Sequence, residues 1–311
     1  MVPGDAPPAD LERLLLQTSR TFALSIPLLP EPTRREVTVA YLLFRIADTF
    51  EDAARWSAAA RRGALAEFSS LLRHPTAAEA RRLASQWSAA RPSGHEGYLA
   101  LVAETPAVVD ALLALAPEAA APIREHVMRS AAGMSEFVAR GTPSGQLRLA
   151  GLADLRDYCY AVAGIVGEML TELFLLRRVE LAGAAEFLRS RAGLFGEGLQ
   201  LVNILKDSDA DAAEGRRYIG PDVERRDVFS LARLDLEAAA EYILRLQAAG
   251  AARGLIAFTA LPVELAWATL TKVETSGPGS KVTRLEVAAI CERLDRALDR
   301  GEPPVRVQPT A

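Results

Sequence analysis

Two groups of carboxylates in this 311-residue chain are spaced so that several oxygen ligands could meet at one point. Within the stretch 200–218, QLVNILKDSDADAAEGRRY, the residues Asn203, Asp207 and Asp211 recur at intervals of four. Residues four apart lie on the same face of a helix, about 6 Å apart along its axis. Like charges stacked in this way repel, so we expect a cation opposite them, and oxygen ligands suit Mg²⁺. A solvated acidic face is the alternative reading of such a spacing taken alone.

The second group ends another apolar helical run, YLLFRIADTFED, at residues 41–52. Asp48 and Asp52 are again four residues apart, and Glu51 lies one turn beyond Asp48. Two such sets on separate helices could face each other across a cavity and hold several Mg²⁺ ions. That arrangement suits the binding of a diphosphate, the neutralisation of its charge and its departure.

Several basic and aromatic residues near these groups have two readings each. Arg20 and Arg45 lie at the edges of apolar stretches, and Arg45 could pair with Asp48 or hold phosphate oxygens through its planar fork. Arg216 and Arg217 carry the same ambiguity. The loop 276–284, SGPGSKVTR, contains Lys281 and Arg284 and could meet a phosphate or be a solvated loop.

Glycines and a proline inside apolar helical patterns are also ambiguous. Gly164 and Gly167 should each cost about 1 kcal/mol relative to Ala, so they indicate either close helix packing or room for a ligand. Tyr158, just before them, is a core tyrosine or a site residue. The apolar stretch that begins at Phe258 contains Pro262, which predicts either a kinked wall around a hydrocarbon pocket or a helix that begins near Pro262.

The composition predicts an all-α protein. Half of the residues are apolar, β-branched residues are sparse, and no strand run, repeat or domain linker is visible. We expect about ten to twelve helices in one domain at residues 10–300, a disordered N-terminus at 1–9 and a flexible tail at 301–311. A helix is predicted to begin near residue 10. Further helices are predicted near 32–54, 102–115, 119–140, 154–177, 184–213, 236–249, 255–272 and 284–300, with two more within 55–98. Breaks are expected at Pro106 and Pro117. The polar stretch 213–227 is predicted to be a loop or cap.

Charge and cysteine usage narrow the functional classes. The net charge of −4 argues against a nucleic-acid partner. Cys159 and Cys291 are expected to be buried free thiols, which suits a reducing cytosol. No secretory signal pattern is visible, and no apolar run approaches the roughly 18–20 residues of a membrane span. No zinc, nucleophilic-triad or dinucleotide-binding signature appears either.

Taken together, these stretches make the chain resemble the squalene/phytoene synthase family. The resemblance spans about residues 19–290 and rests on five motifs in order: SRTFALSI, YLLFRIADTFED, YCYAVAGIVGEMLTELF, QLVNILKDSDADAAEGRRYI and FTALPVELAWATL. It implies an all-α, single-domain isoprenoid synthase helical bundle around a central apolar cavity. It also implies prenyl diphosphate substrates and a transferase that joins two of them head to head.

The resemblance assigns roles to residues by position. It implies Mg²⁺ ligands at Asp48, Glu51, Asp52, Asn203, Asp207 and Asp211. Tyr41 and Tyr158 would lie near the reacting carbons. Residues that would contact the substrates are Arg20, Arg45, Gln200, Lys206, Arg216, Arg217 and Phe258. Lys206 stands where the family usually has Arg, so it keeps the charge but lacks the bidentate fork.

Two members of the family fit different features of the chain. Squalene synthase is favoured by two stretches, DTFED and FTALPVELAWATL, and by Lys281. Lys281 falls where squalene synthases use a basic residue to bind NADPH, and Arg284 is one position from the next such basic site. GRRYI without an aromatic-rich stretch after it is closer to the phytoene type. We therefore expect squalene formation with Mg²⁺ and NADPH, and keep a phytoene or dehydrosqualene synthase, or a non-catalytic partner subunit of the same fold, as alternatives. A cytoplasmic monomer that can associate peripherally with a membrane to release its product is expected.

Overall fold

The computed structural model describes residues 10–141, 147–220 and 222–306, and its regular structure is almost entirely helical. This confirms the predicted all-α, single-domain fold. The expected disorder of residues 1–9 lies outside the described residues. The α-helices, in chain order, are α1 (Leu11–Thr18), α2 (Phe22–Ser25), α3 (Thr33–Glu51), α4 (Ala58–Arg73), α5 (Ala77–Ala90), α6 (Glu96–Ala103), α7 (Thr105–Leu113), α8 (Pro117–Ala139), α9 (Leu152–Cys159), α10 (Ile165–Leu175), α11 (Ala185–Ala213), α12 (Arg225–Ala248), α13 (Arg253–Ser276) and α14 (Arg284–Arg300).

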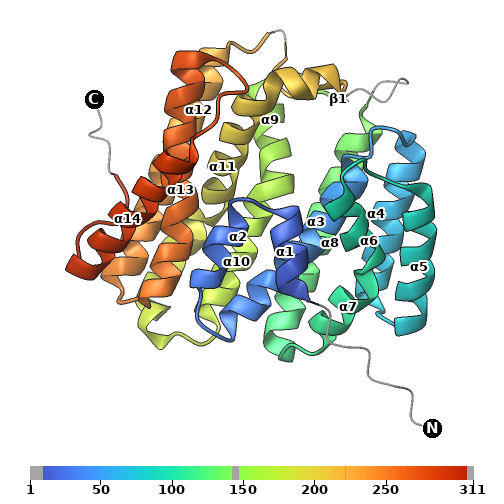
Figure 1. Cartoon of the computed structure of the whole chain (residues 1–311), viewed down its shortest axis with the longest axis horizontal. Helices are drawn as coiled ribbons and strands as arrows, with labels where there is room; N and C mark the ends of the chain where they lie inside the picture. Colours follow the sequence, from blue (N-terminus) through green and yellow to red (C-terminus); the bar gives the residue numbers. More distant parts are fainter. Residues whose placement is uncertain (1–9, 142–146, 221, 307–311) are drawn as a thin grey trace.

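The helices form one bundle (Figure 1). Helices α12, α13 and α14 lie on one side and α4 to α7 on the other, with α3, α8, α10 and α11 between them. The short α1 and α2 cross in front of α3 and α10 and contact α3, α6 and α13. The two helices that carry the acidic motifs, α3 and α11, therefore both belong to the interior of the bundle.

Helix α3 is enclosed on nearly every side. From Glu36 to its end, all of its residues are buried except Tyr41, Arg45 and Asp48. These three are spaced by four and three residues, so they form a single stripe along the helix. The C-cap residue, Asp52, continues the same stripe. Between Glu36 and its end, helix α3 thus leaves only this stripe incompletely buried.

Helix α11 comes unusually close to the chain that runs antiparallel to it. A Cβ atom on Gly167 would lie 2.0 Å from the carbonyl oxygen of Ala192, and one on Gly196 would lie 2.0 Å from that of Ala163. Between α9 and α10 the backbone makes a π-helical turn, Tyr160–Gly164. Such turns often occur at functional sites. The glycines predicted from sequence are therefore sites of close helix packing.

Several boundaries differ from the prediction. Helix α12 begins at Arg225 within the predicted loop, eleven residues before 236. Within the predicted helix 102–115 the chain breaks as expected near Pro106, which lies in the first turn of α7, but the helix before the break, α6, begins earlier, at Glu96. Helix α13 is continuous from Arg253 with Pro262 inside it, so it does not begin at that proline.

Two segments expected to lack regular contacts are ordered. A two-residue parallel pair joins β1 (Leu147–Arg148) to β2 (Arg216–Arg217), although no strand was expected. After α14, the backbone N–H of Arg306 donates to Glu264 Oε1 at 2.9 Å, and Val305 is buried. Residues 301–306 therefore lie against the bundle, and the rest of the expected flexible tail, 307–311, lies outside the described residues.

Two apolar stretches are long enough to cross a membrane by length and composition, namely the run Leu152–Leu175 and α13. Most of each stretch is buried inside the bundle, 72% in the case of α13, so both serve as core helices. These stretches are longer than expected, since no apolar run was predicted to approach the length of a membrane span.

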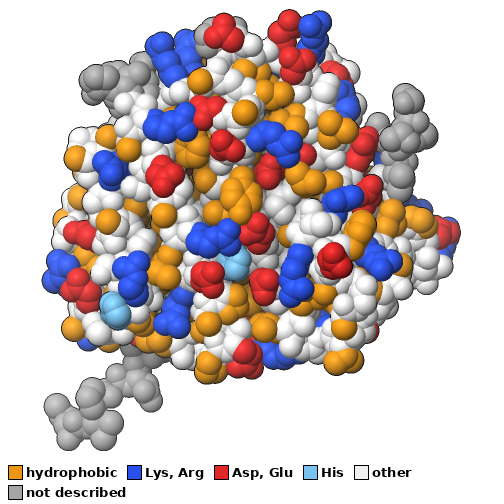
Figure 2. Space-filling view, turned by 180° about the vertical axis from the view of Figure 1, so that it is seen from behind, with side chains coloured by type: hydrophobic (Ala, Val, Ile, Leu, Met, Phe, Trp, Pro, Cys, Tyr) orange, Lys and Arg blue, Asp and Glu red, His pale blue; other side chains and the backbone are white. Residues whose placement is uncertain are grey.

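On the face opposite the view of Figure 1, basic and acidic side chains are interspersed (Figure 2).

Candidate active site

The two acidic motifs line one cavity of about 620 Å³, which we call the polar cavity. All six predicted oxygen ligands contribute to its lining, from α3 and its C-cap on one wall and from α11 on the other: Asp48, Glu51, Asp52, Asn203, Asp207 and Asp211. The segment between α1 and α2 closes a third side and includes Arg20. Residues more than 150 positions apart in the chain thus line one cavity, which is the arrangement that we had considered for the two motifs.

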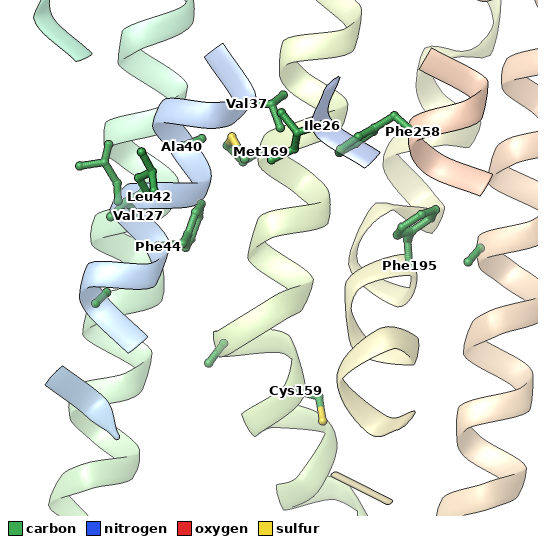
Figure 3. Packing of buried hydrophobic residues seen from close by; sticks show 14 of the residues in the cluster. Ile26, Val37, Ala40, Leu42, Phe44, Val127, Cys159, Met169, Phe195 and Phe258 are labelled. Carbon is green, nitrogen blue, oxygen red and sulfur yellow. The ribbon is translucent and has the colours of Figure 1, made fainter. Parts of the chain in front are cut away.

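A second cavity, the apolar chamber, adjoins the polar cavity and has a volume of about 170 Å³. Helices α3, α10, α11 and α13 supply its apolar walls. Figure 3 shows Phe44, Met169, Phe195 and Phe258 reaching into the space between these helices. Residues common to both cavities mark the junction: Phe22, Arg45, Asp48, Val162, Gln200 and Asn203. The carboxylate of Asp48 and the amide of Asn203 therefore lie where charged and apolar space meet.

Arg216 links the two acidic motifs. Its Nη1 lies 3.4 Å from Asp52 Oδ1, and its Nη2 lies 3.1 Å from Asp211 Oδ1 and 2.8 Å from Glu214 Oε2. Strand alternation explains why the next residue is different: Arg217 points to the other face of β2 and is exposed, outside both cavities. The predicted substrate contact of Arg217 is therefore not supported by its placement.

Arg45 lies over the rings of Tyr41 and Tyr98, at 5.7 and 5.4 Å from their centroids, and its Nη1 is 3.3 Å from Asp48 Oδ2. Tyr41 lines the apolar chamber, and its hydroxyl donates to the carbonyl oxygen of Thr18 at 2.9 Å. The aromatic rings and Asp48 hold the guanidinium in place. Its Nε is buried and has no hydrogen-bond partner among the described residues.

Burial raises the pKa of two carboxyls of the first motif, Asp48 and Glu51. Burial, opposed by Arg45 and reinforced by the charge of Asp52, raises the pKa of Asp48 to about 6. Burial, followed by the charges of Asp52 and Asp48, also raises the pKa of Glu51 well above its usual range. In the second motif, burial raises the pKa of Asp211 against the opposing effect of Arg216. A cation bound beside these carboxyls would stabilise their charged forms.

A tyrosine pair closes the floor of the polar cavity. The hydroxyl of Tyr158 donates to that of Tyr218 at 3.1 Å and lies 3.5 Å from Glu51 Oε1. Burial and the nearby charge of Glu51 raise the pKa of both phenols well above 10. Both hydroxyls therefore stay protonated and remain able to donate a hydrogen bond.

Lys206 and the loop after α13 lie next to each other. The Nζ of Lys206 is 3.1 Å from Asp207 Oδ2 and 3.3 Å from Asn203 Oδ1, and its carbonyl oxygen accepts from the N–H of Gly279 at 2.7 Å. The loop that carries Lys281 is thus attached to the rim of the site. Neither Lys281 nor Arg284 lines the polar cavity or the apolar chamber.

The residues of the polar cavity that the sequence did not predict include one histidine and two tyrosines, His95, Tyr98 and Tyr218. His95 and Tyr98 lie at the start of α6, where no charged motif marks them. Tyr218 had a usable signal, because it follows Arg216 by two residues, directly after β2, and residues two apart in extended chain point to the same side. Among the described residues, no three His, Cys, Asp or Glu side chains are close enough to enclose a metal ion by themselves.

The family model described as squalene/phytoene synthase matches residues 15–229, about two thirds of the chain. Curated relatives include the squalene synthase of Eremothecium gossypii, 30% identical over 68% of this chain and 46% of the relative. The squalene synthase of Rattus norvegicus is also 30% identical, over 66% of this chain and 45% of the relative. The chain spans less than half of the length of these curated relatives.

Solved structures share the fold. The complex of TcSQS with a ligand has a TM-score of 0.74 at 23% identity and covers 94% of this chain and 88% of that chain. A dehydrosqualene synthase in complex with a ligand has a TM-score of 0.51 at 17% identity, over 94% of this chain and 96% of that chain. With the family model matched over both acidic motifs, this chain belongs to the squalene/phytoene synthase family.

Proposed function

We propose that this chain joins two farnesyl diphosphates head to head through a cyclopropyl diphosphate and reduces the product to squalene with NADPH. The observation that carries the proposal is the junction at Asp48 and Asn203, where a cavity lined by oxygen ligands opens into an apolar chamber. A prenyl diphosphate has the same division, with a multiply charged head and a hydrocarbon tail. Curated relatives named as squalene synthases support this choice of substrate.

The donor set fits Mg²⁺ when the ion is shared with the substrate. The six predicted ligands offer only carboxylate and amide oxygens, which this ion prefers. Burial and neighbouring carboxylates raise the pKa of Asp48 and Glu51, so a cation beside them would stabilise their charged forms. Because no three of the described acidic side chains enclose a metal alone, diphosphate oxygens would complete the coordination. Bound there, Mg²⁺ would neutralise the leaving diphosphate.

The residues of the chain would divide the remaining work. Arg20, Arg45, Lys206 and Arg216 would bind diphosphate oxygens as charge builds up on the leaving group. The chamber walls would keep water from the allylic cation, and the ring faces of Tyr41 and Phe44 would stabilise it. The two protonated phenols at the cavity floor would donate hydrogen bonds to the departing anion.

NADPH would act at the rim near Lys206. The loop that holds Lys281 is fixed there by the Gly279 hydrogen bond, so a phosphate bound by the loop would lie beside the second motif. Arg284 begins α14, one turn away from Lys281 along the chain. We propose that Lys281 and Arg284 both bind the coenzyme.

We also propose that the protein is a cytoplasmic monomer. It would associate with membranes only peripherally, to release its product.

The test is a product analysis of the purified protein. Farnesyl diphosphate and Mg²⁺ would be supplied with and without NADPH, and the hydrocarbon would be identified by mass. Squalene that appears only with NADPH supports the proposal. A product that is the same with and without NADPH would replace it with a dehydrosqualene or phytoene synthase.

A non-catalytic partner subunit would give no prenyl product under any of these conditions. The same assay with geranylgeranyl diphosphate tests the length of chain that is accepted. EDTA should abolish turnover, and added Mg²⁺ should restore it.

A further inference from the structure

A third cavity adjoins the polar cavity on the far side of Arg45 and Arg216. This side pocket has a volume of about 490 Å³ and shares part of its wall with the polar cavity through Arg45, Asp52, His95, Tyr98 and Arg216. Its remaining wall comes from the turn after α3 and from the loop before α6. An anion leaving the polar cavity between the two arginines would therefore enter the side pocket.

Three arginines line the side pocket, and their capacity to donate hydrogen bonds is not fully used. The Nε atoms of Arg45 and Arg216 are buried and have no hydrogen-bond partner among the described residues. Arg55 projects from the turn after α3, is exposed, and makes no ion pair or hydrogen bond within the described parts of the chain. The wall of this cavity therefore holds one guanidinium without a partner in the described residues, Arg55, beside two arginines with an unsatisfied Nε. Such a set favours an acceptor-rich, multiply charged anion.

The acidic residues of the pocket are already engaged. Both carboxylates in its wall, Asp52 and Glu214, pair with Arg216. Asp52 is also one of the proposed Mg²⁺ ligands. Arg55 therefore faces the pocket without a competing carboxylate partner, and an incoming phosphate would not have to displace one.

The loop opposite Arg55 is held in one shape. The Nε1 of Trp56 donates to the carbonyl oxygen of Ala90 at 2.9 Å, which ties the turn after α3 to the end of α5. The backbone N–H of His95 donates to Ser93 Oγ at 3.1 Å, and Arg91 pairs with Glu96 at 3.2 Å. Because these contacts fix both walls, the pocket is formed before any ligand arrives, which lowers the cost of binding.

We propose that the side pocket is a subsite for a phosphate-bearing anion, held by Arg55 together with Arg45 and Arg216. This inference rests on the proposed function, which supplies the anion: two diphosphates leave in each reaction. The side pocket would receive diphosphate as it is released and clear the polar cavity for the next substrate. A phosphate group of the coenzyme has the same chemistry and is the other source.

Direct binding of inorganic diphosphate to the purified full chain tests the subsite. Calorimetric titration in EDTA removes the contribution of divalent ions in the polar cavity. We expect Arg55→Gln to weaken diphosphate binding about tenfold, or ~1.4 kcal/mol, the scale of one charge-assisted hydrogen bond. Arg55→Lys should be intermediate, because it keeps the charge without the fork. Arg73→Gln, at an exposed arginine in the last turn of α4, is the matched control and should bind as the unmodified chain does.

Equal affinities in the Arg55→Gln and Arg73→Gln variants would overturn the proposal. So would a loss confined to Arg20→Gln, since Arg20 lines only the polar cavity. A parallel titration with adenosine 2′,5′-bisphosphate tells whether the bound phosphate belongs to released diphosphate or to the coenzyme. If the subsite binds the coenzyme, this compound should compete with diphosphate, and its binding should be weakened in Arg55→Gln. These titrations use no prenyl substrate, so they test the subsite separately from the proposed function. If the protein makes no hydrocarbon but Arg55→Gln still weakens diphosphate binding, only the proposed function is refuted.

Discussion

Arg216 pairs with Asp52 across the polar cavity, with Nη1 3.4 Å from Oδ1. The same guanidinium reaches Asp211 on the opposite wall, so one side chain connects both acidic motifs. A metal ion bound by Asp52 and Asp211 would compete for those contacts and free Arg216 for a phosphate. We therefore propose that this ion pair is the resting arrangement, and that bound Mg²⁺ would take over the two carboxylates from Arg216 when substrate binds.

We expect Arg216→Gln to lower kcat/KM about 100-fold, because it removes a fork that would meet the leaving diphosphate. Arg216→Lys should recover only part of the loss, since an ammonium keeps the charge but lacks the planar fork that matches two phosphate oxygens. Steady-state kinetics with farnesyl diphosphate measure both. Arg217→Gln, one residue along and on the exposed face of β2, is the control. If Arg217→Gln proves as damaging as Arg216→Gln, the placement of these two side chains is wrong.

Replacing a proposed Mg²⁺ ligand should abolish turnover without unfolding the protein. Asp48→Asn or Asp207→Asn should reduce kcat by a factor of about 1,000 and raise the Mg²⁺ concentration needed for half-maximal rate. Asp209→Asn is matched in chemistry and helix but lies on the exposed side of α11, outside the cavity. Turnover and circular dichroism should show three folded variants, of which only Asp209→Asn is active. Activity retained in Asp48→Asn would revive the non-catalytic alternative.

Gly167→Ala should destabilise the fold by several kcal/mol. The added Cβ would lie 2.0 Å from the carbonyl oxygen of Ala192, so α10 and α11 would have to separate. Gly63→Ala is the control, because Gly63 lies within α4 and a Cβ there meets nothing within 4 Å. That change should instead stabilise the protein by about 1 kcal/mol, the helix propensity difference. Urea unfolding of both variants measures whether the free energy of unfolding falls or rises. Equal changes in the two variants would show that α10 and α11 do not approach each other closely at Gly167.

The buried carboxyl of Asp235 should make stability depend on pH. Burial, opposed by Arg156 and reinforced by the charge of Glu197, raises its pKa from 3.8 to about 7. Because the pKa of Asp235 is higher in the folded than in the unfolded state, its protonated carboxyl contributes fully to the free energy of unfolding below about pH 4. That contribution is lost as the pH rises toward 7 and the buried carboxyl becomes charged. One oxygen, Oδ2, has no hydrogen-bond partner among the described residues.

We therefore expect Asp235→Asn to raise the free energy of unfolding by about 1–2 kcal/mol at pH 8, because it removes a buried charge, and to leave it nearly unchanged at pH 4. Thermal unfolding at both pH values measures the difference. Asp110→Asn, at an exposed position on α7, controls for the change in net charge. A variant less stable than the parent at pH 8 would contradict the sign.

Much of the fold was predictable because its signals are local. Helix α14 begins and ends at the predicted residues 284 and 300, since a Thr283–Glu286 capping box and Gly301 mark its ends. Helix α12 was missed over its first eleven residues because a charged first turn resembles a loop in sequence. The strand pair at Arg216 has no propensity signal, since it exists only where β1 supplies the partner.

The sequence by itself determined which residues carry oxygen ligands and that each motif presents them on one helical face, because a four-residue spacing fixes direction within a helix. Only the tertiary structure decided that Asp48 and Asp207 share one cavity, that Arg216 faces it while Arg217 does not, and that His95 and Tyr98 join it. Those facts depend on how separate helices pack, and packing is set by contacts between residues far apart in the chain. The side pocket at Arg55 belongs to the same class, because its two walls come from segments about forty residues apart.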